Sequence, residues 1–445
     1  MRYEKYKQTG TKWITSIPVS WDMQKIGLLF AQRKEKVSDK DFAPISVTKN
    51  GILPQLATAA KTDDGDNRKK VCVGDFVINS RSDRKGSCGI SDLEGSVSLI
   101  NIVLQPRDQL SGRYAHYLLR NHLFSEEYYR NGRGIVADLW TTRYSEMKTI
   151  LLPVPPRAEQ DQIVRYLDWQ VSKINRLIAA KRKQIAVLQE QQKHRISDAV
   201  LRGISDNIVL KDSGIEWIGV IPEHWNVIRC KYVFSERDER SVAGEEEHLS
   251  MSQKYGLVPD SKLDERRMLS ESYAGGKICY KDDLVLNRLK AHLGVFALAP
   301  QKGVISPDYT VLVPNTERIL PAYGEAVLKS DLCRRELRIR VRGIIEGFWR
   351  LYTDDFNTIV IPLPPLEEQA RIMDYLSALN EKFVALKQNL EQEIATLQDF
   401  RTRMISDVVT GQVDVRGIEV PEYEIFEDVS SDDEENDLTE EQEDD

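Results

Sequence analysis

The sequence has little of what membrane, secreted or metal-binding proteins need. Its 445 residues contain no run of eighteen apolar residues, so no membrane-spanning helix is expected. There are only 5 cysteines, with no Cys-x-x-Cys pair and no Cys and His spacing typical of zinc ligands. Neither a disulfide framework nor a metal site is therefore expected. The first residues of the chain are polar and charged, which argues against a secretory signal and favours a cytoplasmic protein with reduced thiols.

Motifs for catalysis are missing as well. No Gly-x-x-x-x-Gly-Lys loop occurs, so we expect no ATP binding by this chain. An adenine methyltransferase needs an Asn/Asp-Pro-Pro-aromatic loop to hold a flipped base, and the nearest segment, Ser306–Tyr309, lacks the second proline. A metal-dependent nuclease needs clustered carboxylates and a lysine, of which Glu146–Lys148 supplies only a fragment. We therefore predict a chain without catalytic residues, metal or bound cofactor.

The net charge of −8 conceals two parts of opposite sign. Of the 70 acidic residues, 15 lie between Ile418 and Asp445, a segment without Lys or Arg. The remaining 55 stand against all 62 Lys and Arg, so residues 1–417 carry a net charge of +7. This mildly basic body permits a polyanionic partner. Residues 413–445 are predicted as an acidic disordered tail, which either solubilises the chain or competes with nucleic acid for a basic surface.

The chain contains an internal repeat. The motif Trp-Ile-x-x-Ile-Pro-x-x-Trp begins at Trp13 and returns at Trp217. Four further motifs return in the same order, with an offset that drifts only from 204 to 209 residues. They are Gly-x-x-Pro at Gly51 and Gly256, Asp-x-Val-x-Asn at Asp75 and Asp283, Arg-Gly-Ile at Arg133 and Arg342, and Pro-x-Pro-Pro-x-x-Glu-Gln at Pro153 and Pro362. Such a series indicates one ancestral unit that was duplicated.

Each repeat divides into a globule and a long helix. Short apolar segments between turn residues predict strands, and Tyr114–Leu119 predicts a helix packed against them, so each globule is of the α/β (α+β) class. The double proline before each second half suits a helix N-terminus. We therefore predict a first globular domain at 1–155, a long helix at 156–205, a second globular domain at 206–364, a second long helix at 365–412 and a tail at 413–445.

Both helices show the period of a coiled-coil seam. The predicted seam residues of the first helix are Leu167, Val171, Ile174, Ile178, Ile185 and Leu188. Those of the second are Leu376, Phe383, Leu390, Ile394, Leu397 and Met404. A helix of about 46 residues is roughly 70 Å long, too long to bury its stripe on its own globule. We expect the two helices to pair as an antiparallel coiled coil in a pseudo-two-fold arrangement. An intermolecular coil is the alternative.

The repeated openings, the Asp-x-Val-x-Asn segments and the two Pro-x-Pro-Pro-x-x-Glu-Gln helix starts resemble the specificity subunit of type I restriction-modification enzymes. The resemblance covers residues 1–412. It implies two target-recognition domains, each of which binds half of an asymmetric bipartite site on double-stranded DNA. It also implies that the helices set the gap and dock two adenine-methylating modification subunits, which restriction subunits join. S-adenosylmethionine, ATP and magnesium would then be used by these partners.

Basic residues at matched places in the repeat are the candidate DNA contacts, because Lys and Arg neutralise phosphates and Arg also binds guanine edges. After the Asp-x-Val-x-Asn segments these are Arg81, Arg84 and Lys85 in the first repeat, and Arg288 and Lys290 in the second. A second candidate cluster is Arg68, Lys69 and Lys70.

A third candidate cluster is Arg338, Arg340 and Arg342. On a strand these three guanidinium groups would share one face; on a helix they would pair with Glu336. Asn79 and Asn287 either contact adenine or simply end a strand. Trp140 and Trp349 are expected in the core rather than as stacking platforms.

Two alternative functions remain open. One is a coiled-coil scaffold that never binds DNA, and the other is a self-contained nuclease or methyltransferase.

Overall fold

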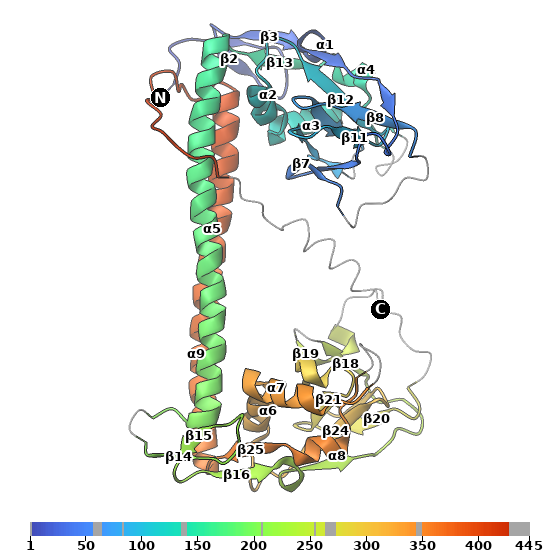
Figure 1. The fold of residues 1–445 in the computed structure, drawn as a ribbon, viewed down its shortest axis with the longest axis vertical. Helices are drawn as coiled ribbons and strands as arrows, with labels where there is room; N and C mark the ends of the chain where they lie inside the picture. The colour runs from blue at the N-terminus through green and yellow to red at the C-terminus, as the bar shows by residue number, and fades with distance from the viewer. Residues whose placement is uncertain are drawn as a thin grey trace. The chain divides into compact units, whose positions relative to one another are not determined.

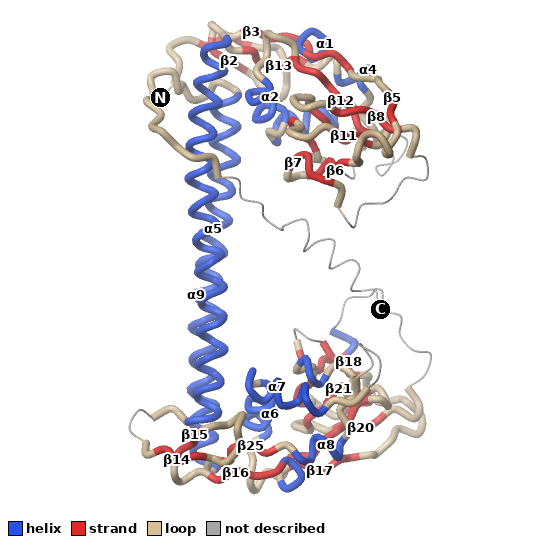
Figure 2. Tube along the Cα trace, viewed as in Figure 1, coloured by secondary structure: helices blue, strands red, loops and turns tan. Residues whose placement is uncertain are grey.

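The computed structural model describes residues 2–56, 65–81, 84–134, 140–205, 208–252, 255–262, 273–343 and 349–426, apart from the side chain of His292. The chain forms two compact units. Unit 1 comprises residues 1–182 and 391–445, and unit 2 comprises residues 183–390. Each unit contains one strand-rich globule and parts of two long helices, α5 (Arg157–Arg202) and α9 (Leu366–Val409) (Figures 1 and 2).

The globule of unit 1 contains thirteen strands and four short helices among its described residues. The strands are β1 (Tyr6–Gln8), β2 (Ser16–Pro18), β3 (Asp22–Lys25), β4 (Phe30–Gln32), β5 (Lys36–Val37), β6 (Ile45–Thr48), β7 (Gly51–Pro54), β8 (Arg68–Val71), β9 (Phe76–Asn79), β10 (Cys88–Ile90), β11 (Gly95–Val97), β12 (Asn101–Pro106) and β13 (Leu151–Val154). The helices are α1 (Ile26–Leu29), α2 (Gly112–Leu119), α3 (His122–Arg130) and α4 (Tyr144–Met147).

The globule of unit 2 repeats these elements with small changes. Its strands are β14 (Leu210–Asp212), β15 (Val220–Pro222), β16 (Asn226–Arg229), β17 (Phe234–Arg237), β18 (Leu249–Ser252), β19 (Gly256–Pro259), β20 (Lys277–Cys279), β21 (Leu284–Asn287), β22 (Phe296–Leu298), β23 (Gly303–Ile305), β24 (Tyr309–Pro314) and β25 (Val360–Leu363). Its helices are α6 (Pro321–Lys329), α7 (Asp331–Arg340) and α8 (Thr353–Thr358), with 3-10 turns at Cys230–Tyr232, Asp260–Lys262 and Ala291–Leu293.

The same strand order recurs in both units. The central antiparallel sheet is β10-β9-β12-β4 in unit 1 and β22-β21-β24-β17 in unit 2. The hairpin β6–β7 corresponds to β18–β19, and the pair β3–β13 corresponds to β16–β25. The sequence repeat is therefore a repeat of topology, and the pairing of β5 with β8 in unit 1 is reduced in unit 2 to a single bridge between Arg240 and Lys277.

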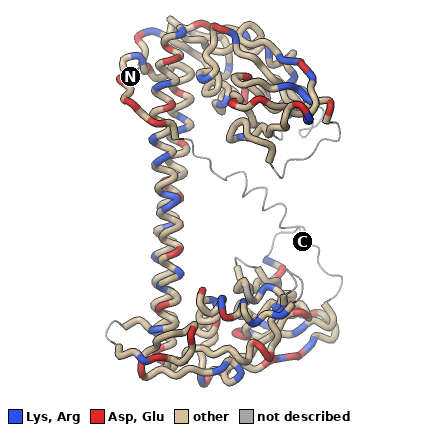
Figure 3. Tube along the Cα trace, in the orientation of Figure 1, with Lys and Arg blue, Asp and Glu red and all other residues tan. Residues whose placement is uncertain are grey.

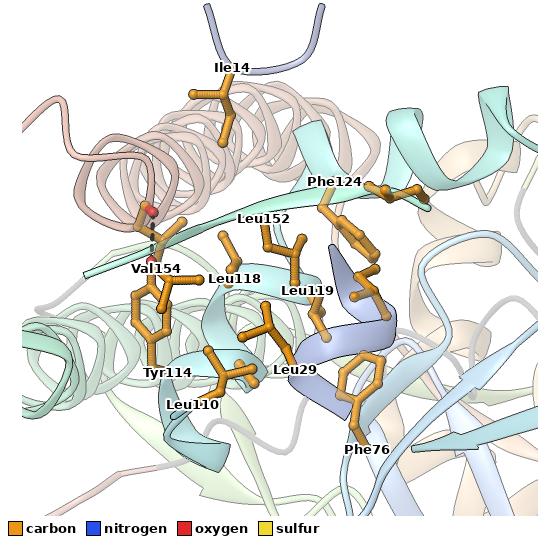
Figure 4. Packing of buried hydrophobic residues seen from close by; sticks show 14 of the residues in the cluster. Ile14, Leu29, Phe76, Leu110, Tyr114, Leu118, Leu119, Phe124, Leu152 and Val154 are labelled. Carbon is orange, nitrogen blue, oxygen red and sulfur yellow. Dashed lines mark hydrogen bonds between the residues drawn. The ribbon is translucent and has the colours of Figure 1, made fainter. Parts of the chain in front are cut away.

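The central sheet of each unit is buried on both faces, which explains its uninterrupted apolar strands. In β9, Phe76 and Ile78 join the large core beneath the helices, whereas Val77 joins a small core on the opposite face. Figure 4 shows Phe76 in this large core, together with Leu29 and with Leu118 and Leu119 of α2. In unit 2, Leu284 and Leu286 likewise face the large core while Val285 faces the small one.

In each unit α5 and α9 lie side by side (Figure 1). In unit 1 the Arg401 guanidinium donates to Asn175 Oδ1 over 2.6 Å, and Lys181 pairs with Glu393. In unit 2 Gln192 Nε2 donates to Asn380 Oδ1 over 3.0 Å. The predicted seam residues Leu167, Ile174, Ile178 and Leu376 are buried, and the other eight are half-buried.

The Glu-Gln pair at the start of each long helix serves the fold. The Trp21 indole donates to Glu159 over 2.9 Å, and the Trp225 indole donates to Glu368 over 3.0 Å. Fully buried Gln160 accepts from the Ser111 N–H and donates to two backbone carbonyls. Its counterpart Gln369 makes the same three bonds in unit 2. The motif that marks these helices in the sequence thus fixes the helix to its globule.

The end of each long helix is held by the tyrosine of a short helix. The Tyr114 hydroxyl of α2 donates to Val409 O at 3.1 Å, so the end of α9 belongs to unit 1. The Tyr323 hydroxyl of α6 donates to Val200 O at 3.0 Å, so the end of α5 belongs to unit 2. Each globule is therefore bonded to the start of one long helix and to the end of the other.

Residues 411–426 form a C-terminal strap, which corrects part of the predicted disordered tail. Val415 is fully buried, and Gln162 of α5 donates to the carbonyls of Val415 and Ile418. At the end of the strap, Ser172 and Asn175 of α5 bond the backbone of Phe426. Apolar residues between the charges allow this packing. Residues 427–445 of the predicted tail lie outside the described part of the chain.

No helix among the described residues is long and apolar enough to cross a membrane. The described cysteines Cys72, Cys88, Cys230, Cys279 and Cys333 carry free thiols. Burial raises the pKa of the Cys88 thiol to about 11 and that of Cys279 to about 12, so these thiols stay protonated at neutral pH.

Candidate nucleic-acid interface

The two units bring the same pair of loops together at the end of the central sheet. We call them the strand-end loops: residues 80–87 with 131–143 in unit 1, and residues 288–295 with 341–352 in unit 2. In unit 1 the Thr142 N–H donates to Ser80 O at 3.0 Å, and in unit 2 the Leu351 N–H donates to Arg288 O at 3.0 Å. Residues 82–83, 135–139 and 344–348 of these loops, which include Ile135 and Ile344 of the repeated motif, lie outside the described residues.

The strand-end loops of unit 1 gather predicted and unpredicted basic residues. Arg84 and Lys85 are exposed, while Arg81 is half-buried and bridges to Thr141. Lys85 pairs with Glu126 and lies 5.8 Å from the centre of the Tyr129 ring. An exposed pair of this kind contributes about 0–1 kcal/mol, so a phosphate can take the place of the carboxylate.

The strand-end loops of unit 2 carry a related but different set. The Arg288 guanidinium donates to Asp308 O over 2.6 Å, and Lys290 is exposed. Arg342 pairs with Asp355, and its backbone pairs with that of Arg350, which is exposed. Figure 3 shows Lys and Arg interspersed with Asp and Glu over each unit, so the loops are distinguished by exposure and position rather than by excess charge alone.

Sequence reasoning missed three arginines of these loops. The Arg133 side chain is 85% exposed, and Arg143 and Arg350 are exposed beside the predicted residues. The signal for Arg133 was present, because it is the repeat counterpart of the predicted Arg342. Arg143 directly follows Thr142, which bonds Ser80, and Arg350 directly precedes Leu351, which bonds Arg288. No local sequence pattern predicts these two contacts.

The cluster at Arg68, Lys69 and Lys70 is bonded into the fold. Arg68 on β8 is 6% exposed and donates to the Ser96 side chain and carbonyl. Lys69 donates to two backbone carbonyls, and burial lowers its pKa. Lys70 pairs with Glu35 at 3.3 Å and lies over the Phe42 ring. This strand therefore offers fewer charges to a phosphate backbone than its sequence indicates.

The arginines near position 340 are helical, and the strand arrangement is wrong. Helix α7 includes Arg338 and ends at Arg340, which pairs with Glu336 one turn earlier. Arg338 is exposed, whereas Arg342 lies beyond the helix in the strand-end loop. The run Glu336–Arg340 favours a helix because its ion pair spans one turn. The three guanidinium groups therefore do not share a strand face.

The asparagines and tryptophans singled out in the sequence have local structural contacts. Asn79 Oδ1 accepts from the Arg81 N–H, and Asn287 Oδ1 accepts from the Leu289 N–H, so both side chains cap the ends of their strands. Trp140 is half-buried and donates to Tyr129 O at 2.7 Å, and Trp349 is half-buried too. A role of either pair toward DNA stays a prediction.

The fragments that resembled catalytic motifs are part of the loop framework. The Ser145 hydroxyl donates to Glu146, which together with Arg133 at 4.0 Å lowers the pKa of that carboxyl. Asp308 of the Ser306–Tyr309 segment accepts from Arg288. Within the described residues, no group of three or more His, Cys, Asp and Glu side chains is placed to hold a metal ion.

Comparison with known proteins finds similar sequences that are all linked to type I restriction enzymes. Residues 230–396 match the type I restriction modification DNA specificity domain. The chain is 22% identical to a putative type I restriction enzyme specificity subunit (MjaX) of Methanocaldococcus jannaschii, over 93% of this chain and 97% of the relative. The MjaVIII specificity subunit of the same organism is 24% identical over 61% of this chain and 64% of its own length.

A solved structure extends the similarity to the fold. A chain from a structural study of complex assembly and conformational transition in a type I R-M system aligns with a TM-score of 0.59 and 16% identity. The alignment covers 89% of the present chain and 99% of that chain. Mixed helix and strand elements in the same arrangement, the specificity-domain match and the full-length relative agree with the resemblance of the repeated motifs. Residues 230–396 thus match the specificity domain, and along most of its length the chain is similar to specificity subunits of type I restriction enzymes.

Proposed function

We propose that this chain is the non-catalytic DNA sequence-specificity subunit of a type I restriction-modification enzyme. Each unit binds one half of an asymmetric bipartite target on double-stranded DNA. The observation that carries this proposal is the repeated topology with basic strand-end loops at the same end of both central sheets. Because the loops carry different residues in the two units, the two half-sites differ in sequence.

The long helices act in this proposal as an antiparallel coiled coil that sets the gap between the half-sites. Contacts within the units support the pairing. As the residue number on α5 rises from 175 through 181 to 192, its partner on α9 falls from 401 through 393 to 380. Opposite trends of this kind are characteristic of antiparallel helices. The seam residues, all buried or half-buried, agree with the pairing.

The partners follow from the family. Two modification subunits dock on the chain, and restriction subunits join that complex. Those partners use S-adenosylmethionine, ATP and magnesium, whereas this chain binds the DNA. The relatives support this assignment because they are specificity subunits of type I restriction enzymes.

A methylation map of genomic DNA, with and without this gene and in the presence of the host's modification subunit, tests the proposal. We expect a bipartite adenine-methylated motif that disappears with the gene. An unchanged map would overturn the function. The purified chain alone, assayed with S-adenosylmethionine and magnesium, should neither methylate nor cleave DNA.

The modular arrangement has its own tests. Replacement of residues 206–364 by the corresponding domain of a relative should change one half of the motif, and a change in both halves would contradict modular recognition. Insertion of seven residues into each long helix should lengthen the gap, and an unchanged gap would mean that the helices do not set it. The logarithm of the DNA-binding constant of the assembled complex should fall linearly with the logarithm of the salt concentration.

A further inference from the structure

The Gly-x-x-Pro motif, which the function above leaves unused, begins the second strand of a hairpin in each unit. In unit 1 the hairpin joins β6 to β7, with Thr48 opposite Gly51. In unit 2 it joins β18 to β19, with Ser252 opposite Gly256. Both glycines have a positive φ, +121° and +72°, a conformation that favours glycine at the turn.

These glycines place each hairpin against the strand that follows a strand-end loop. A Cβ added to Gly89 of β10 would lie 3.3 Å from the Cα of Gly51, so the two backbones approach closely. A Cβ added to Gly256 would lie 3.1 Å from the Cβ of Ala297, which is on β22. Because β10 begins directly after loop 80–87, the close approach of Gly51 to Gly89 lies two residues from the end of a loop that carries proposed DNA contacts.

The backbone of the unit 1 tip is fixed by hydrogen bonds, and its side chains lie at the surface of the unit. The Thr48 hydroxyl donates to Gly51 O over 3.1 Å and accepts from the Asn50 N–H over 3.1 Å. The Arg120 guanidinium donates to Lys49 O from the end of α2. The side chains of Lys49 and Asn50 are exposed. A tip with a fixed backbone loses little conformational freedom when these side chains bind a ligand.

The two hairpins correspond between the units, but the residues of their turns differ. The unit 2 turn is one residue longer than that of unit 1, and Tyr255, 65% exposed, precedes its glycine. The repeat counterpart of Arg120 is Lys329, which pairs with Glu325 at 2.7 Å. Two domains that bind unlike half-sites need different exposed side chains on corresponding hairpins.

We propose that the hairpin tip of unit 1 reads bases, with Asn50 and Lys49 as specificity-determining residues; this inference rests on the proposed function. A side-chain amide bonds the N6 and N7 edge of adenine with two hydrogen bonds, and a lysine bonds O6 and N7 of guanine. Arg84 and Lys85 of the neighbouring strand-end loop contact phosphates and hold the tip in register.

The test uses the full chain in complex with the modification subunit. The variants are Asn50→Ala, Lys49→Ala and the control Lys25→Ala, which removes an exposed lysine from β3 of the same unit. We expect Asn50→Ala to reduce discrimination roughly 5- to 150-fold at one base pair of one half-site. The other half-site and the salt dependence of binding should not change. Lys25→Ala should leave the motif unchanged.

The outcomes separate this inference from the proposed function. If wild-type protein directs no bipartite motif, the proposed function fails. If wild type directs the motif and Asn50→Ala and Lys49→Ala preserve every position of it, the reading role of the tip is wrong. Equal weakening on all sequences with a lower salt slope would make the tip a phosphate contact and would also overturn the proposal. Yield of the assembled complex checks that each variant folds.

Discussion

Buried polar contacts correspond between unit 1 and unit 2, whereas the exposed loops carry different residues. The Arg33 guanidinium bonds the buried Asp75 carboxylate over 2.6 Å, and the Arg237 guanidinium bonds Asp283 over 3.0 Å. In the strand-end loops, by contrast, Lys85 pairs with Glu126 while Arg288 bonds the carbonyl of Asp308. The difference indicates that the repeated motifs maintain the fold. Under the proposed function, recognition then depends on residues which the repeat does not preserve.

A second difference between the units is the C-terminal strap, which packs on α5 in unit 1. Ser172 and Asn175, which bond the strap, are buried. Their repeat counterparts on α9 in unit 2 are Glu381 and Val384, and both are exposed. Unit 1 has therefore gained a packed segment on a helix face that solvent covers in unit 2.

The largest expected effect tests whether the buried framework is equivalent in the two units. Gln160→Met and Gln369→Met each leave one buried N–H and two carbonyls without their partner. Each unpaired buried group costs about 1–3 kcal/mol, so we expect a loss of unfolding free energy of about 3–5 kcal/mol for either variant. Urea unfolding of the purified chain measures it. A large loss from one substitution and none from the other would show that Gln160 and Gln369 are not equivalent in the two units.

The framework was predictable because its causes are periodic or repeated. The duplication, the double prolines and the seven-residue apolar spacing indicate two globules and two long helices from the sequence alone. The roles of Glu159 and Gln160 were not predictable, because their partners Trp21 and Ser111 lie far away in sequence. A helix-start motif predicts a helix, but it does not predict which residues its side chains bond to.

The candidate site was less predictable, because exposure is a property of the folded chain. Arg68 looked like a phosphate contact, but its strand places the guanidinium inside against Ser96. Arg133 could have been predicted as a candidate DNA contact, because its repeat counterpart Arg342 was predicted as one. The packing of the strap was not predicted, because its acidic composition is typical of a disordered tail. Its contacts also join segments about 250 residues apart, as between Gln162 and Val415.

The strap is the next way to sharpen the comparison of the units. Val415→Ala removes two methyl groups from a fully buried site, which should cost about 2 kcal/mol for opening of the strap. Cleavage after Arg416 by trypsin should then be roughly 30-fold faster, because cleavage follows the opened population. Val209→Ala, at a site 68% exposed in unit 2, is the control and should not change this rate. Equal rates for both variants would contradict the packed strap.

A pH difference between the units should follow from His116, whose repeat counterpart in unit 2 is Glu325. Burial, with Arg120 alongside, lowers the pKa of His116 from 6.5 to about 3. Between those values the unfolded chain binds a proton that the folded chain does not bind, so stability falls as the pH falls below 6.5. At pH 5 the expected loss is about 2 kcal/mol.

His116→Gln should remove this part of the pH dependence. The decrease in unfolding free energy between pH 7 and pH 5 should become about 2 kcal/mol smaller than in wild type, as measured by urea unfolding at both pH values. His194→Gln on α5 is the control, because the His194 side chain is 74% exposed. An unchanged pH dependence in His116→Gln would show that this histidine does not titrate as described.

The smallest expected effect compares the strand-end loops directly. Arg84→Ala in unit 1 and Lys290→Ala in unit 2 each remove one exposed cation, so each should reduce the slope of log affinity against log salt by about 0.9. The double variant should reduce it by about twice that amount, since the two sites belong to separate units. Lys70→Ala should leave the slope unchanged, because Lys70 is held by Glu35 and the Phe42 ring. A slope that falls for Lys70 and not for Arg84 would move the phosphate contacts of unit 1 from the strand-end loops to β8.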